Sequence, residues 1–344
     1  MPCIAAQLLE EGEASAPTAG SRIRGDVQSK VMPRCWVCGA RERGRAAPHW
    51  QRCGWCGLTW QRDAVADGGR LHDTIESGPV SMVKIAAAGA ILDDVTLRQA
   101  ALAQDLWLPA GPNGPASHTH RPASGVLTPL ADLQSDAVTL VVLSRADETN
   151  FAALLGSTCA SFAEVIVVRD APASEPVRAD GVTLLDRPLD GHFGAQRSAA
   201  QALVATPWAF HLDTDETLPT ETLRRLGRVA RAARESGFEA VGLPRRNWVD
   251  GALSDHWPDT QYRLVRQSVR FPEAVHERPD ACATWWRTTV DLGGRIDHHL
   301  TGGRVKERHA QYQRLGQHGD RADDANALLR PFRDDYAAAP IRRP

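Results

Sequence analysis

Apolar residues in the middle of the chain fall into short runs that alternate with segments of helical spacing. Runs rich in Val, Leu, Ile and Ala predict buried strands, and the segments between them predict helices. In chain order we expect a strand in 136–150, a helix in 151–160, strands in 163–170 and 182–188, a helix in 198–204 and a strand in 208–212. This alternation predicts an α/β fold with a doubly wound, mostly parallel sheet flanked by helices.

The last of these strands ends in an acidic cluster, Asp213-Thr214-Asp215-Glu216. Alternate residues of an extended segment point to the same side, so Asp213 and Asp215 can face one site. Ligands of a doubly wound sheet bind beyond the carboxyl ends of its strands, and Asp170 falls at the same edge. Hard carboxylate oxygens suit Mg²⁺ or Mn²⁺ that is shared with substrate phosphates. The alternative is that the two aspartates only stabilise a turn.

Two C-x-x-C pairs, CWVC and CGWC, occur near the start of the chain, and each is followed by glycine. This spacing is typical of a zinc ribbon, in which each pair aims two thiolates at one tetrahedral ion. Four cysteine ligands leave no open position, so we expect a structural Zn²⁺. Disulfides are the alternative, which a cytosolic chain disfavours. The predicted ligands are Cys35, Cys38, Cys53 and Cys56.

The sequence divides into five parts. Residues 1–30 predict a mobile tail, and residues 31–62 hold the zinc ribbon. Residues 63–134 combine helical spacing with a Pro/Gly/Ser-rich linker, and they pack on the ribbon, on the main α/β domain of residues 135–300, or on a second copy of the chain. Residues 301–344 predict a polar helix, solvated or facing a second copy in a homodimer, and a tail.

Length and charge narrow the classes of function. The chain has 344 residues, 42% of them hydrophobic, which is enough to bury a substantial core. Its formal net charge of −2 argues against binding of nucleic acid through phosphate contacts. We see no apolar run of membrane-spanning length and no N-terminal signal pattern, so we expect a cytoplasmic protein without a stable membrane anchor.

Five segments in the second half of the chain support a family resemblance. They are GHFGAQRSAA (191–200), HLDTDET (211–217), LPRRNWVDG (243–251), HWPDTQYRLVRQSVRFPE (256–273) and AVHERP (274–279). In this order they resemble glycosyltransferase family 2 with the GT-A fold, and more narrowly its bacterial branch of lipopolysaccharide-core-type transferases. The resemblance covers roughly residues 136 to 312. A zinc ribbon is uncommon beside such a domain, which fits natural-product biosynthesis.

The resemblance implies a nucleotide-diphospho-sugar donor and a catalytic metal ion. It places the donor against Ser144, Arg145, Asp147, Glu148, Asp170, Arg197, Asp213 and Arg263. It implies Mg²⁺ or Mn²⁺ on Asp213 and Asp215, completed by His299, with His276 and His298 as alternatives. Two loops depart from the family, because SRADE replaces its T-x-N-E turn and VVRDAPAS replaces its VVVDSGS-like loop. The nucleotide base therefore stays open.

Sugar transfer also needs a base that takes the proton of the acceptor. By the resemblance, Glu277 of the VHE motif is the predicted base and acts with Asp215 and His276 as the catalytic set. Asp259 and Glu216 are the alternative bases, in which case Glu277 only orients His276.

We therefore expect a metal-dependent glycosyltransferase, inverting by the resemblance, whose acceptor is a soluble metabolite, natural-product intermediate or saccharide. Two other classes of function stay open. One is a degenerate scaffold whose ribbon recruits a partner, against which the intact acidic and VHE motifs argue. The other is a sugar nucleotidyltransferase or hydrolase, against which the lack of a Gly-rich, basic phosphate loop after the first strand argues.

Overall fold

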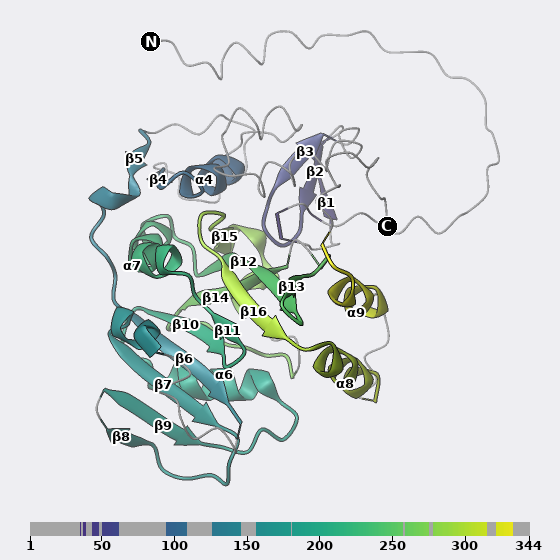
Figure 1. The fold of residues 1–344 in the computed structure, drawn as a ribbon. Coiled ribbons are helices and arrows are strands. Elements are labelled where there is room, and N and C mark those ends of the chain that lie inside the picture. Colours follow the sequence, from purple (N-terminus) through teal and green to yellow (C-terminus); the bar gives the residue numbers. More distant parts are fainter. Residues whose placement is uncertain are drawn as a thin grey trace, which may run out of the picture.

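The centre of the protein is one large mixed sheet with helices on both faces and a small N-terminal sheet beside it (Figure 1). This computed structural model describes residues 35, 37–38, 43–47, 50–61, 94–108, 126–145, 156–179, 181–256, 259–274, 278–314 and 321–332. The strand order in the large sheet is β11-β16-β12-β14-β10-β6-β7-β9-β8, with β13 and β15 paired to β12.

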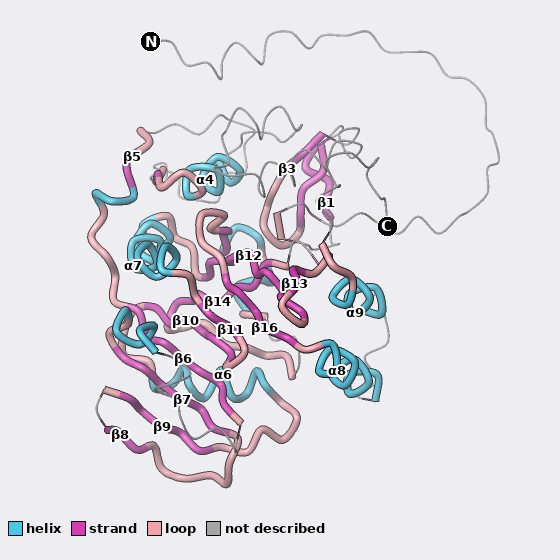
Figure 2. The backbone as a smooth tube through the Cα atoms, viewed as in Figure 1, coloured by secondary structure: helices cyan, strands magenta, loops and turns pink. Residues whose placement is uncertain are grey.

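Strands, in magenta, form the middle of the fold, and helices, in cyan, lie around them (Figure 2). The large sheet comprises β6 (Val138–Ser144), β7 (Glu164–Arg169), β8 (Val177–Ala179), β9 (Val182–Asp186), β10 (Trp208–Asp213), β11 (Glu216–Thr217), β12 (Ala240–Val249), β13 (Ala252–Leu253), β14 (Thr260–Arg266), β15 (Thr288–Val290) and β16 (Ile296–Leu300). The helices are α4 (Asp94–Leu102), α6 (Phe193–Leu203), α7 (Thr220–Glu235), α8 (Gly302–Arg314) and α9 (Arg321–Leu329). Short 3-10 turns are η2 (Leu130–Asp132), η3 (Gly156–Ser161), η4 (Asp280–Ala283) and η5 (Trp285–Arg287).

The predicted α/β class is confirmed by the pairing of the central strands. Strands β10, β6, β7 and β9 are parallel neighbours, and β14 continues the sheet in antiparallel orientation before β12. Val141 and Ile166 pack on the side of α6, whereas Leu140 and Val167 pack with α7 on the opposite face. The sheet is therefore doubly wound, as expected for a GT-A type fold.

Helix α6 is fixed tightly against the segment that follows β14. The His192 ring caps its first turn, because Nδ1 accepts a hydrogen bond from the backbone N–H of Ala195 at 2.9 Å. A Cβ atom on Gly194 would lie 2.1 Å from the Glu273 carbonyl oxygen and 2.6 Å from that of Phe271. Only glycine permits this close approach of helix and backbone, and the approach sets where Arg197 lies one turn later.

Strand β14 contains an irregularity beside the acidic cluster. Val241 pairs with Leu264 and Gly242 pairs with Tyr262, so Arg263 is the extra residue of a bulge. A bulge turns a side chain away from the regular alternation and is common next to functional sites. Here it leaves the Arg263 guanidinium in contact with Asp213.

The N-terminal part holds a three-stranded antiparallel sheet of β1 (Arg43–Ala47), β2 (Trp50–Cys53) and β3 (Thr59–Gln61), with Cys53 at the end of β2, Cys56 in the turn that follows, and Cys35 and Cys38 before β1. This sheet packs on the α6 side of the large sheet, and the cysteines share one core cluster with Tyr262 and Val290. Helix α4 belongs to residues 63–134, whose packing the sequence left undecided. It contacts both the cysteine-bearing segment and the main α/β domain. Gln99 donates to the Cys56 carbonyl oxygen at 2.7 Å, and Leu102 packs in the core with α7. A two-stranded sheet, β4 (Leu106–Trp107) with β5 (Thr128–Pro129), follows α4.

Three helical segments differ from expectation. The helix expected in 151–160 is a 3-10 turn over Gly156–Ser161, and residues 151–155 lie outside the described part. Helix α7 was not expected at all. The expected C-terminal helix is described as α8 and α9. Among the described residues, none of the helices is both long and apolar enough to cross a membrane.

Candidate active site

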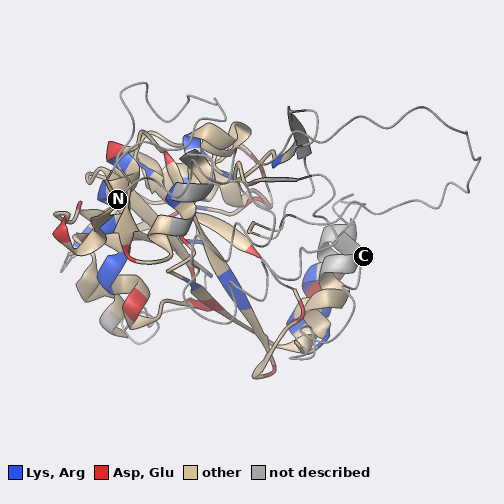
Figure 3. Cartoon of the chain, turned by 90° about the horizontal axis from the view of Figure 1, so that it is seen from above, with Lys and Arg blue, Asp and Glu red and all other residues tan. Residues whose placement is uncertain are grey.

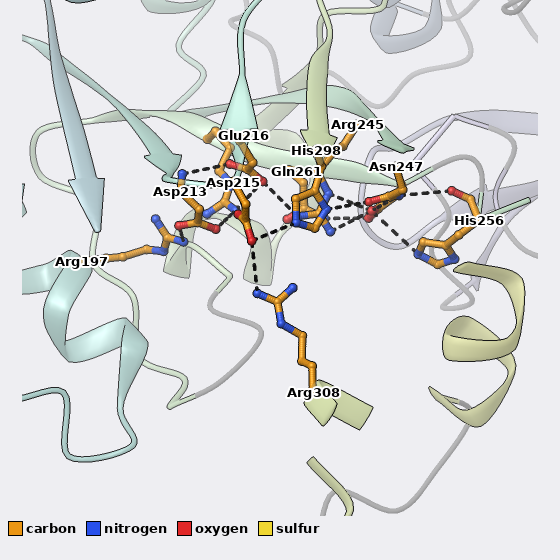
Figure 4. Close-up of polar contacts among 12 residues, drawn as sticks. Arg197, Asp213, Asp215, Glu216, Arg245, Asn247, His256, Gln261, His298 and Arg308 are labelled. Carbon is orange, nitrogen blue, oxygen red and sulfur yellow. Dashed lines mark hydrogen bonds and ion pairs between the residues drawn. The ribbon is translucent and has the colours of Figure 1, made fainter. Parts of the chain in front are cut away.

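The acidic cluster lies at the carboxyl end of the parallel strands, where β10 leads into β11 (Figure 4). Strand β11 pairs with β16, so that Glu216 lies opposite His298. The backbone N–H of His299 donates to the Asp215 carbonyl oxygen at 2.8 Å and fixes the turn between the aspartates. Segments far apart in the sequence thus place acidic, basic and imidazole groups together.

Asp213 is held by two arginines. Its Oδ1 lies 2.8 Å from Arg197 Nη2, and its Oδ2 lies 2.6 Å from Arg263 Nη2. Burial acts to raise the pKa of Asp213, but the charges of Arg197 and Arg263 outweigh it and hold the pKa well below its usual value. Asp213 is therefore a carboxylate whose two oxygens both face guanidinium groups.

Asp215 has a different environment. Its buried Oδ2 lies 3.5 Å from the buried Nε2 atom of His298 and 3.2 Å from Arg304 Nη2, so its partners are ion pairs and no hydrogen bond of regular geometry reaches it among the described residues. Burial raises the pKa of Asp215, but His298 and the charge of Arg308 outweigh it, so the pKa is lowered. The His298 ring is fixed from behind, because its Nδ1 lies 2.8 Å from Asn247 Oδ1. A carboxylate oxygen and an imidazole nitrogen thus face each other at this point of the site.

This pair of atoms fits a divalent cation. Carboxylate oxygen and imidazole nitrogen are both metal donors, and Mg²⁺ or Mn²⁺ needs only one or two protein ligands when phosphates supply the rest. A hydrogen bond that orients the imidazole ring from behind, as Asn247 makes with His298, is also usual at metal sites. Asp213, predicted as a further ligand, turns both oxygens to arginines instead. Predicted ligand His299 is exposed, and its Nε2 lies 2.9 Å from the Thr217 hydroxyl.

Glu216 and Asp259, the alternative bases, belong to a buried ion-pair network. Glu216 Oε1 lies 2.9 Å from Arg245 Nη1 and 3.0 Å from Arg263 Nη2. Asp259 Oδ2 lies 2.8 Å from Arg245 Nη2 and accepts from the Asn247 amide at 2.9 Å. Burial raises the pKa of Asp259, but Arg245 outweighs it and keeps the pKa low. A carboxylate held in this way is a weak proton acceptor.

The remaining predicted donor residues lie at the same strand ends, or outside the described part. Ser144 ends β6 and is buried, and the exposed Arg145 follows it. The backbone N–H of Asp170 donates to the Ser144 carbonyl oxygen at 3.0 Å, and Asp170 Oδ1 accepts from the Leu189 N–H at 2.9 Å. Four predicted residues lie outside the described residues: Asp147, Glu148, His276 and Glu277.

Sequence reasoning missed several groups at this site. Arg304 Nη2 and Arg308 Nη2, both on α8, lie 3.2 and 3.9 Å from Asp215 Oδ2. Arg245 and Asn247 belonged to a quoted motif but had no role assigned to them. His298 was an alternative ligand in the sequence prediction, and strand alternation favours it over His299, because Ile296 and Leu300 in β16 are buried on the same side.

The four cysteines form a second candidate metal centre. Their sulfur atoms all lie within 4.8 Å of one another, with Cys35 and Cys56 3.6 Å apart and Cys38 and Cys53 3.5 Å apart. Each is at most 3% exposed. Four converging thiols at these separations fit tetrahedral coordination of one soft or borderline ion. The predicted clustering of the four cysteines is therefore confirmed.

No protein-family model and no curated protein sequence matches the chain. The chain is similar to solved structures of S. aureus TarS. One has 15% identity over 48% of this chain and 36% of that chain, with a TM-score of 0.32. TarS 1-349 in complex with UDP-GlcNAc has 17% identity over 48% of this chain and 58% of that chain, with a TM-score of 0.32. The chain thus spans less than two thirds of the length of these structures.

Proposed function

We propose that this chain is a metal-dependent glycosyltransferase that takes its sugar from a nucleotide-diphospho-sugar. The observation that supports this best is the pair of metal-donor atoms, Asp215 Oδ2 and His298 Nε2, which lie 3.5 Å apart at the carboxyl edge of the parallel strands. Arginines surround this pair, and a divalent cation together with guanidinium groups is the chemistry that stabilises a diphosphate. The order of the five family-like motifs gives further support.

Each group has a proposed role in the transfer. A cation bound at Asp215 and His298 would offset the charge that develops on the departing diphosphate. Arg197 and Arg263 fix Asp213, which then accepts hydrogen bonds from the ribose or sugar of the donor. Ser144, Arg145 and Asp170 contact the nucleotide at the neighbouring strand ends.

The acceptor side follows by elimination among carboxylates. Asp259 is paired with Arg245, and Glu216 is paired with Arg245 and Arg263, so both carboxylates accept a proton poorly. We therefore assign the role of general base to Glu277. Inversion by direct displacement, a soluble acceptor and a role in natural-product biosynthesis belong to the same proposal. For the cysteine cluster we propose structural Zn²⁺.

The test is a thermal-shift panel of UDP, GDP, dTDP and CDP, each with and without Mn²⁺. A ligand that binds only the folded state stabilises it, by about 2.7 kcal/mol at a hundredfold excess over its dissociation constant. We expect one nucleotide to raise the Tm of the wild type only with Mn²⁺, and Asp215→Asn to abolish the shift. If no nucleotide stabilises the protein in either condition, the proposed function is wrong.

Two adjacent histidines provide a matched pair of variants. His298→Gln should abolish the Mn²⁺-dependent shift, because Nε2 faces Asp215, whereas His299→Gln should retain it. If only His299→Gln loses the shift, then His299, the ligand predicted from sequence, binds the cation and His298 does not. Release of pyrophosphate from a nucleoside triphosphate and a sugar phosphate would instead indicate a nucleotidyltransferase.

A further inference from the structure

Helix α8 presents two arginines to the candidate active site. It begins directly after β16, and its first turn is fixed to the β12–β13 turn because the Gly302 N–H donates to the Asp250 carboxylate at 3.1 Å. Val305 packs into the core. Arg304 and Arg308 are four residues apart and therefore lie on one helix face. Figure 4 shows Arg308 extending from this helix to Asp215.

The contacts of these arginines with Asp215 do little for stability. The side chains of Arg304 and Arg308 are 34% and 39% exposed, and ion pairs this accessible contribute at most about 1 kcal/mol. Asp215 already has His298 beside it. Two guanidinium groups next to one carboxylate instead leave positive charge unmatched at the mouth of the site.

The charges of the whole network show the same excess. Among the described residues in contact here, four carboxylates face five guanidinium groups: Asp213, Asp215, Glu216 and Asp259 against Arg197, Arg245, Arg263, Arg304 and Arg308. Elsewhere in the fold, acidic and basic positions are interspersed (Figure 3). A divalent cation at Asp215 would enlarge the local excess, so an anion with more than one negative charge is the complementary ligand.

We propose that Arg304 and Arg308 bind the diphosphate of the nucleotide donor and neutralise it as it leaves. This inference rests on the proposed function. A cation at Asp215 repels both guanidinium groups from the carboxylate, and they then pair with phosphate oxygens, for which the planar guanidinium fork is well suited. Before the donor binds, the two arginines compete with the cation for Asp215.

Removing both arginines should therefore change the affinity for Mn²⁺ alone and the affinity for the Mn²⁺–nucleoside diphosphate complex in opposite directions. The double variant Arg304→Ala/Arg308→Ala should bind Mn²⁺ alone at least as tightly as the wild type does. It should bind the Mn²⁺ complex of the stabilising nucleoside diphosphate about 10- to 100-fold more weakly, a loss of about 1.4–2.8 kcal/mol, because two partly exposed charge-assisted contacts are removed. Mn²⁺ binding is followed by electron paramagnetic resonance and nucleotide binding by titration calorimetry, with Mn²⁺-pyrophosphate as a probe that carries no base.

Lys306→Ala is the matched control, since this exposed cation lies on α8 between the two arginines and makes no contact with Asp215. It should bind both ligands as the wild type does. Arg304→Lys/Arg308→Lys keeps the charge and should recover part of the lost nucleotide affinity. Equal nucleotide affinity in the double alanine variant and the wild type would overturn the inference and leave the proposed function intact. Weaker binding of Mn²⁺ alone would also overturn it, because the arginines would then only support the site. A wild type that binds no nucleoside diphosphate would refute the proposed function and this inference with it.

Discussion

The most direct structural test is Gly194→Ala, which places one methyl group between α6 and the backbone of the 271–273 segment. The new Cβ would lie 2.1 Å from the Glu273 carbonyl oxygen, whereas ordinary contact begins at 3.4 Å. Helix and segment must therefore separate by more than 1 Å, since a backbone carbonyl cannot swing aside as a flexible side chain does. Overpacking of this kind costs about 1–3 kcal/mol. The separation also strains the 2.7 Å hydrogen bond from Phe193 N to Ala274 O, which adds about 1 kcal/mol.

The expected loss is therefore about 2–4 kcal/mol of unfolding free energy, or a fall in Tm of about 5 °C or more. Differential scanning calorimetry measures the fall. Donor affinity should decrease as well, because Arg197 lies one turn further along α6 and reaches Asp213 at 2.8 Å. Gly303→Ala is the matched control, since its Cβ would meet nothing nearer than 4.0 Å and helical Gly→Ala changes are neutral to stabilising. A Gly194→Ala protein that melts within 2 °C of the wild type would refute the packing argument.

Two further predictions concern the cysteines. We expect one zinc ion per chain by atomic absorption in the wild type and none in Cys53→Ser. Cys53→Ser should also lower the Tm well beyond the effect of the control Cys159→Ser. The reason is that the binding free energy of structural zinc is folding free energy, roughly 10 kcal/mol or more in small peptides. A folded wild type that contains no zinc would contradict this. Burial raises the pKa of Cys282 to about 12, so at pH 8 iodoacetamide should modify the half-buried Cys159 before Cys282 in the native protein, as followed by peptide mass spectrometry. Earlier modification of Cys282 would show that its burial is wrong.

The central strands were predictable from sequence because local pattern determines them. The run AEVIVVRD gives β7, and DAVTLVVLS gives β6, since strands buried on both faces are continuous apolar runs. The acidic cluster could also be placed, because the carboxyl ends of parallel strands meet at one edge. The four-cysteine cluster followed from spacing alone, as ligand sets on tight turns do.

Other features depend on contacts that no local pattern encodes. Helix α7 reads TETLRRLGRVARAARE, in which arginines obscure a buried face of Leu226, Val229, Ala230 and Ala233 at helical spacing. The position of Arg263 depends on a bulge that appears only when β14 is paired with β12. Arg304 and Arg308 reach Asp215 only because β16 carries α8 back to the strand ends. Interactions of this kind come from tertiary pairing and not from sequence neighbours.

The packing of the ribbon also bears on the scaffold hypothesis. A ribbon that recruits a partner needs an accessible surface around its metal, yet Cys53 and Cys56 are fully buried in one core cluster with β14 and β15. The Thr260 hydroxyl donates to the Val37 carbonyl oxygen at 2.8 Å, and the Thr288 hydroxyl donates to the carbonyl oxygen of Trp55 at 3.1 Å. The strand that bonds to the ribbon through Thr260 is the strand whose bulge directs Arg263 to Asp213. The cysteine cluster therefore supports β14 from behind the candidate active site, and this arrangement fits a structural role in the proposed enzyme better than a scaffold that displays a metal site to others.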